Sequence, residues 1–260
     1  KERTHTLLTL HRKLGRWLQL GGHADGNENL LEVAMQEARE ESGLTTLQFV
    51  DTHIFDLDKH IPMGAGLGGG SGNAAVALRG MNQLSGEPFS NQVLCELAAQ
   101  LGSDCAFFIE GQAAWMRGRG EVIEPGAAEV AERLRGTRVV LFRPNFGVET
   151  AGAYGRLAAG APDSYEPEAA GVARLHDFIE SGTLGDVLFN SFEGPVGSKY
   201  LAISTLLAQL RAAGVKCLMS GSGSCCFALL EENCADVSQI EEIVRDAWGE
   251  AVFWVETSIC

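Results

Sequence analysis

The sequence predicts an α+β fold, because helical and strand patterns mix irregularly along its whole length. Of the 260 residues, 45% are hydrophobic and 21% are charged, which is typical of an ordinary globular protein with one large domain or two smaller ones. The seven cysteines are scattered and form no CxxC pair, which argues against a disulfide framework and against a zinc site.

Four elements are predicted ahead of residue 60. Residues 6–10 and 16–20 form short strands around a basic turn. Residues 29–42 form a helix, because their apolar side chains recur at helical spacing and Gly43 is a good C-terminal stop. Residues 49–57 alternate loosely between apolar and polar side chains, which favours a strand.

After residue 60, a helix is predicted that runs to about Leu84. A second helix, capped by Ser90, is predicted to run to about Leu101. Residues 105–123 contain two or three short strands separated by glycines. The remaining predictions are strands at 139–142, 216–219, 227–230 and 252–255, helices at 175–188, 199–213 and 237–248, and a loop at 162–168. Cys225 and Cys226 stand in an apolar run and are predicted to be buried.

The most informative motif is a glycine run, with six glycines among residues 64–72 between a strand and a helix. Glycine lets backbone N–H groups approach a ligand, and a helix N-terminus adds unpaired donors, so the run predicts a phosphate site. A Walker A loop is excluded because no lysine follows the glycines. The alternatives are a dinucleotide fingerprint on Gly64, Gly66 and Gly69 and a flexible linker, which Leu67 and the alanine-rich helix start argue against.

The net charge and the hydropathy of the sequence limit the expected cellular location and the classes of binding partner. The net charge of -14 argues against general affinity for nucleic acid or for an anionic membrane. The sequence carries no signal peptide and no apolar run of ~18 residues, so the cytoplasm is the expected location. Lys1 stands in mid-pattern where a methionine would begin a chain, so we expect a natural N-terminus ahead of it.

Several motifs in fixed order resemble the GHMP kinases across residues 60–260. Residues 62–71 match the run Pro-x-Gly-Ala-Gly-Leu-Gly-Gly-Gly-Ser, and residues 101–108 match Leu-Gly-x-Asp-x-x-Phe-Phe. Further matches are Phe-Gly-Val-x-Thr at 146–150 with Tyr154, an Asn-x-x-Glu segment at 190–193 and a second glycine motif at 219–224. The branch most resembled is the one that phosphorylates 4-diphosphocytidyl-2-C-methyl-D-erythritol.

The resemblance implies a two-layer kinase body, in which residues 60–143 are the remainder of an N-terminal, ATP-binding domain and residues 144–260 are the C-terminal domain. It implies ATP-dependent phosphorylation of a hydroxyl group in the non-mevalonate route to isoprenoid precursors, with ATP and Mg²⁺ and a small-molecule substrate. Neither nucleic acid nor a membrane is an implied partner, and the oligomeric state stays open.

The same resemblance assigns roles to individual residues. Asp104 is the implied catalytic base, although the aspartate taken alone is typical of a turn or helix end. Gly221, Ser222 and Gly223 close over phosphates or substrate, or else form only a tight turn between two strands. Thr150 and Tyr154 are implied in substrate binding. The implied ATP and phosphate contacts are Pro62, Gly64, Ala65, Gly66, Leu67, Gly68, Gly69, Gly70 and Ser71.

Two departures from the kinase pattern bear on activity. The chain has Ser71-Gly72-Asn73 where family members commonly have Ser-Ser-Asp, which removes a hydroxyl that could meet metal or phosphate. The family's Pro-x-Lys-x-Asn-Leu segment, whose lysine assists catalysis, has no match in this sequence. The loss of that lysine segment implies an impaired kinase.

The segment 1–59 carries a different pattern, and residues 5–58 resemble the first half of a Nudix hydrolase with a β-β-α-β order. Glu37, Glu40 and Glu41 share one helix face, where clustered carboxylates can bind Mg²⁺. The matching positions of the Nudix box are Gly22, Glu28, Glu37, Ala38, Glu40, Glu41, Gly43 and Leu44, and Gln36 replaces its arginine. The family join falls at residues 59–62. Two alternatives therefore stand beside the kinase: a Mg²⁺-dependent Nudix hydrolase of a nucleoside diphosphate derivative, and an inactive chimeric or misassembled product.

Overall fold

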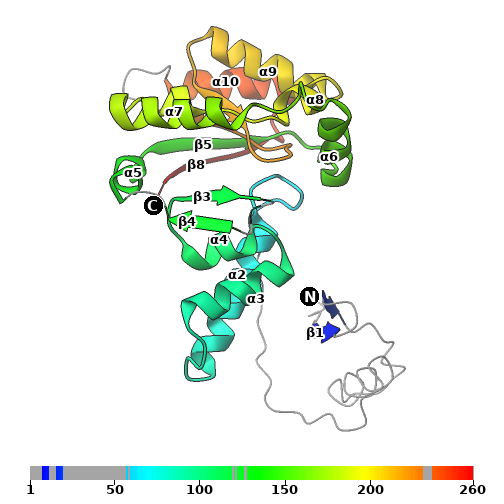
Figure 1. Cartoon of the computed structure of the whole chain (residues 1–260). Coiled ribbons are helices and arrows are strands. Elements are labelled where there is room, and N and C mark those ends of the chain that lie inside the picture. The colour runs from blue at the N-terminus through cyan, green and yellow to red at the C-terminus, as the bar shows by residue number, and fades with distance from the viewer. Residues whose placement is uncertain are drawn as a thin grey trace, which may run out of the picture. The chain divides into compact units, whose positions relative to one another are not determined.

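The computed structural model describes residues 8–11, 16–19, 57, 59–118, 120, 122–125, 128–230 and 236–259. Its contacts define two compact units, one containing Gly70–Pro125 and the other containing His60–Gly69 with Gly126–Cys260 (Figure 1). These units are grouped by contacts alone, and the domain boundaries predicted at 59 and 143 stay predictions. In the described ranges, no helix is both long enough and apolar enough to cross a bilayer; the cytoplasmic location stays a prediction.

Ahead of residue 57 the structure describes one antiparallel hairpin. Strand β1 (Leu8–His11) pairs with β2 (Arg16–Gln19), with Leu8 opposite Gln19. This confirms the two strands predicted at 6–10 and 16–20. The helix predicted at 29–42 lies outside the described residues, and so does the strand predicted at 49–57 except for its last residue.

The first unit packs three helices around small apolar side chains. They are α2 (Gly69–Leu84), α3 (Asn91–Leu101) and α4 (Cys105–Glu110), followed by the antiparallel strands β3 (Ala114–Arg117) and β4 (Val122–Pro125). The hydroxyl of Ser90 caps α3 by accepting from the N–H of Val93, as predicted. The buried side chains are Ala75, Leu78, Leu94, Ala98, Cys105, Ala106 and Ile109.

Helix α4 corrects the sequence prediction, which placed only strands in residues 105–123. Its six residues are an apolar run too short for its period to distinguish a strand from a helix. Helical geometry places Cys105, Ala106 and Ile109 in the core together. Gly111, at φ 63°, then ends the helix by donating its N–H to the carbonyl of Phe107.

The second unit is built on a four-stranded antiparallel sheet in the order β6-β7-β5-β8. These strands are β6 (Cys217–Met219), β7 (Cys226–Leu229), β5 (Arg138–Arg143) and β8 (Phe253–Ser258). Helices α9 (Leu201–Ala212) and α10 (Val237–Trp248) cover one face of the sheet (Figure 1). Fully buried Val140 and Phe142 point into this core, so their alternating neighbours Leu141 and Arg143 point to the opposite face.

Shorter helices surround this sheet, and the sequence analysis missed three of them: α5 (Ala128–Leu134), α6 (Thr150–Ala159) and α8 (Glu193–Gly197). Helix α7 (Glu168–Ser181) begins seven residues before the predicted start and stops at Gly182, and the single-turn 3₁₀ helix η1 (Leu184–Val187) follows. The other predicted strands and helices of this unit are confirmed to within three residues. Cys225 and Cys226 are completely buried, as predicted.

Candidate functional site

The glycine run forms a loop that only glycine accommodates easily, followed by the first turn of α2. Gly64, Gly66 and Gly68 have φ values of 62°, 75° and 64°, in the left-handed region that disfavours residues with a Cβ. Helix α2 begins at Gly69, so the loop leads directly into unpaired helix N–H groups. The predicted phosphate-binding residues 62–71 are therefore one continuous loop and helix start.

The second glycine motif is the turn between β6 and β7, and it contacts the first loop backbone to backbone. The N–H of Cys225 donates to the carbonyl of Ala65 at 3.0 Å, and the hydroxyl of Ser220 donates to the carbonyl of Gly66 at 2.8 Å. A Cβ on Gly66 would stand 2.2 Å from the carbonyl oxygen of Ser220, and one on Gly221 would stand 3.0 Å from that of Gly66. The two motifs, 150 residues apart in sequence, thus form one glycine-lined structure, here called the double glycine loop (residues 62–69 and 220–224).

Helix α6 carries both predicted substrate residues, and its first residue, Thr150, contacts the double glycine loop. The hydroxyl of Thr150 lies 3.3 Å from that of Ser222, inside the second motif. Tyr154 stands one turn further along α6 and is more than half exposed. Its ring meets Phe192 edge-on, with 4.8 Å between ring centroids. The aromatic face is therefore held in place yet open to a ligand.

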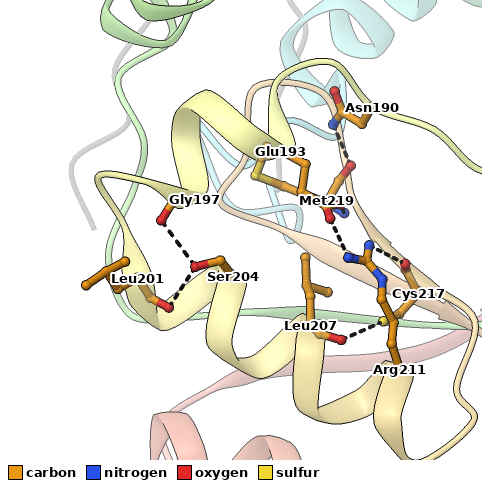
Figure 2. A network of polar contacts seen from close by, with 9 residues as sticks. All are labelled: Asn190, Glu193, Gly197, Leu201, Ser204, Leu207, Arg211, Cys217 and Met219. Carbon is orange, nitrogen blue, oxygen red and sulfur yellow. Dashed lines mark hydrogen bonds and ion pairs between the residues drawn. The ribbon is translucent and has the colours of Figure 1, made fainter. Parts of the chain in front are cut away.

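A polar network anchors the strand end and turn of the second motif, as Figure 2 shows. The side-chain amide of Asn190 donates to the carbonyls of Met219 and Gly221 at 2.7 and 2.8 Å. The carboxylate of Glu193 accepts from the N–H of Met219 at 3.2 Å and pairs with Arg211 at 2.6 Å. This hydrogen-bonded pair with Glu193 raises the pKa of the Arg211 guanidinium. The network fixes the strand end from which the second motif starts.

We expect Glu193→Ala to lower the free energy of unfolding by about 2 kcal/mol, because it leaves the N–H of Met219 without its acceptor and removes the counter-charge of Arg211. Glu256→Ala is the matched control, since it breaks an exposed pair with Arg138 that should contribute about 1 kcal/mol or less. Urea denaturation measures both. Equal losses in the two variants would show that the buried network adds nothing beyond a surface ion pair.

In the first unit, Asp104 stands immediately before α4. It stands at the cap position but makes no capping bond, it is exposed, and no described residue forms an ion pair with it. Its neighbour Cys105 hydrogen-bonds the hydroxyl of Ser71, in the first turn of α2. Burial raises the pKa of the Cys105 thiol, the Ser71 hydroxyl lowers it, and the Asp104 carboxylate raises it further. The end of the glycine run and the Asp104 turn therefore lie side by side.

Comparison with known proteins identifies the architecture. The family described as "GHMP kinases N terminal domain" matches residues 29–112, and "GHMP kinases C terminal" matches residues 173–250. The chain belongs to the GHMP kinase family. Among curated relatives of this GHMP kinase, the 4-diphosphocytidyl-2-C-methyl-D-erythritol kinase of Synechococcus sp. is 34% identical, with 89% of this chain and 76% of that protein covered.

Two further relatives carry the same name. The kinase of Desulfotalea psychrophila is 33% identical over 77% of this chain and 65% of its own length. That of Nitratidesulfovibrio vulgaris is 37% identical over 67% of this chain and 60% of its own length. The chain thus spans less than two thirds of these two relatives.

Solved structures give the same fold for this GHMP kinase. A crystal structure of 4-(cytidine 5'-diphospho)-2C-methyl-D-erythritol kinase superposes with a TM-score of 0.60 at 32% identity, covering 77% of this chain and 69% of that one. A homoserine kinase from Cytophaga hutchinsonii superposes with a TM-score of 0.55 at 17% identity, which supports the fold alone.

The kinase match at residues 29–112 overlaps the segment that resembles a Nudix hydrolase. Residues 29–58 fall in both, so the kinase family extends ahead of the join predicted at 59–62. Glu37, Glu40 and Glu41 lie outside the described residues. The Nudix resemblance and the metal site that it implies stay predictions.

The sequence did not predict the side-chain contacts that anchor the second glycine motif of this GHMP kinase. The Asn-x-x-Glu segment was noticed only as a motif, with no contact assigned to Asn190 or Glu193. Arg211 carried no signal at all, because its partner Glu193 is distant in sequence. The contacts of Arg211 with Glu193 and with the carbonyl of Cys217 appear only once α9 packs on the sheet.

Proposed function

We propose that this chain transfers the γ-phosphoryl group of ATP to a hydroxyl of 4-diphosphocytidyl-2-C-methyl-D-erythritol, in the non-mevalonate route to isoprenoid precursors. The observation that carries the proposal is the double glycine loop, whose two halves approach so closely that a Cβ on Gly66 would stand 2.2 Å from a backbone oxygen. Backbone N–H groups in such a loop suit an anion that must be approached closely. The names of the relatives supply the substrate.

In this proposal, residues 62–71 hold the triphosphate of ATP. The N–H groups of the loop and of the first turn of α2 offset its negative charge, and the helix dipole favours it further. Mg²⁺ would be carried by the phosphates of ATP, since it is usually held by one or two protein groups together with substrate phosphates. The hydroxyl of Ser71 is the side-chain oxygen that the helix start offers.

Asp104 is the proposed base. It takes the proton of the substrate hydroxyl as that oxygen bonds to the γ-phosphorus and the bond to the leaving oxygen of ADP breaks. The carboxylate is exposed and has no ion-pair partner among the described residues. Catalysis then depends on orientation of the two substrates, which is the main contribution of proteins to phosphoryl transfer.

Thr150 and Tyr154 are the proposed substrate contacts. The Tyr154 ring, held edge-on by Phe192, offers its exposed face to a flat group such as the cytosine of the substrate. The Thr150 hydroxyl connects that ring to the second glycine motif through Ser222. Helix α6 therefore carries both the proposed contact for the cytosine and the residue beside the proposed phosphate site.

The purified chain, given ATP, Mg²⁺ and the cytidyl-erythritol substrate, should form ADP and the phosphorylated product in equal amounts. Phosphorus NMR of the mixture distinguishes this from hydrolysis, because a Nudix-type reaction would release a nucleoside monophosphate and leave ATP intact. A folded chain that consumes no ATP would refute the activity. Monophosphate release abolished by Glu41→Gln would support the hydrolase instead.

A further inference from the structure

Arg143 is a cation for which the described residues supply no counter-charge. It is the last residue of β5, and its Nε is buried without a hydrogen-bond partner among the described residues. Within the same part of the chain, no carboxylate forms an ion pair with it. Arg138, at the other end of the same strand, pairs with Glu256 at 3.2 Å. A half-buried guanidinium with an unpartnered Nε costs free energy, so an anion beside Arg143 would be favoured.

The Arg143 guanidinium borders the double glycine loop. A Cβ on Gly147 would lie 3.6 Å from Nη2 of Arg143 and 3.9 Å from the carbonyl oxygen of Gly64, so both atoms adjoin the same point. The Cys225 thiol reports the same proximity: burial raises its pKa to about 12, and the Arg143 charge acts in the opposite direction. Cys225 in turn donates its N–H to Ala65 of the first loop.

The glycine run itself carries no cation. From Ile61 to Asn73 there is no lysine, arginine or histidine. A Walker A loop ends in a lysine that reaches the phosphates, and this loop has none. Lys59 and His60 stand just ahead of the run, and β5 brings a further cation, Arg143, beside the loop from some eighty residues later in the sequence.

We propose that Arg143 positions the phosphate of a ligand bound at the double glycine loop. Its guanidinium donates hydrogen bonds to the phosphate oxygens. This rests on the proposed function, and the phosphate is either the polyphosphate of ATP or the diphosphate of the second substrate. The planar fork of arginine matches two phosphate oxygens at once, and such charge-assisted bonds are the strong ones. The Nη groups are the donors that would meet the phosphate, since Nη2 adjoins the loop beside Gly147.

The test is calorimetric titration of wild type, Arg143→Met and Arg143→Lys with ADP alone, with the cytidyl-erythritol substrate alone and with inorganic tripolyphosphate. Arg143→Met should weaken at least one of these by about ten-fold or more, and Arg143→Lys should recover part of the loss. A loss with ADP assigns the contact to the nucleotide; a loss with the substrate alone assigns it to the diphosphate. Arg138→Met, from the same strand, should bind every probe like wild type.

Thermal melting without ligand separates this role from a structural one. Removing a half-buried cation that has no ion-pair partner among the described residues should leave the Tm of the ligand-free protein unchanged or raised, while the Tm rise produced by ligand shrinks. A lower ligand-free Tm with unchanged affinities would overturn the proposal, as would a wild type that binds none of the probes. A wild type that binds ADP through Arg143 but never transfers phosphate would refute the proposed function and leave this inference standing.

Discussion

Asp104→Asn should lower kcat for phosphoryl transfer by about 10³-fold, within the range that a positioned general base contributes. The change keeps the size of the side chain and removes only its ability to accept a proton. Because Asp104 makes no capping bond and forms no ion pair among the described residues, the fold should not depend on its charge. Initial rates at saturating ATP, with KM for both substrates, measure the effect.

The pattern of kinetic constants is what identifies a base. The KM values and the affinity for ADP should stay near those of wild type, because the carboxylate acts on the transferred proton rather than on binding. Asp246→Asn controls for the loss of one negative charge, because Asp246 is also an exposed aspartate but lies on α10. Wild-type kcat in Asp104→Asn would remove Asp104 from the mechanism, and loss of ADP binding without a change in kcat would assign it to the nucleotide.

Local signals explain which parts of this fold the sequence predicted. Helix α10 was predicted with its observed bounds because its apolar side chains repeat at helical spacing and Asp236 caps it, accepting from the N–H of Ser238. The glycine run was recognised because a left-handed backbone at Gly64, Gly66 and Gly68 requires glycine whatever packs around it. Features of this kind depend on only a few neighbouring residues, so the sequence alone can predict them.

The missed elements depend on contacts made far along the chain. Helices α5 and α8 have only 7 and 5 residues, too short to be stable without tertiary packing. In α8, buried Val196 and Gly197 join the core only because α9 packs on them, where Ser204 donates to the carbonyl of Gly197. Arg143 shows the same limit in the site, since nothing in residues 138–143 indicates that Gly64 will lie nearby.

Gly66→Ala should weaken ADP binding by about 100-fold or more, since it attacks the double glycine loop at its tightest point. The φ of 75° strains any residue with a Cβ, and that Cβ would stand 2.2 Å from the backbone oxygen of Ser220 and 3.0 Å from the nitrogen of Gly223. Neither atom can move as a flexible side chain would. Relief of the clash must separate the loops, which breaks the bond from Ser220 to the carbonyl of Gly66.

Gly64→Ala separates the clash from the backbone strain. Gly64 has nearly the same φ, 62°, but a Cβ there would meet nothing within 4 Å. Its cost should be the strain, about 1–2 kcal/mol in the free energy of unfolding, with a smaller loss of ADP affinity than in Gly66→Ala. Gly66→Ala should lose more stability by urea denaturation and nearly all binding by calorimetry. If both variants bind ADP equally well, contact between the two glycine motifs is not what forms the phosphate site, and the Ser220–Gly66 bond serves only to hold the fold together.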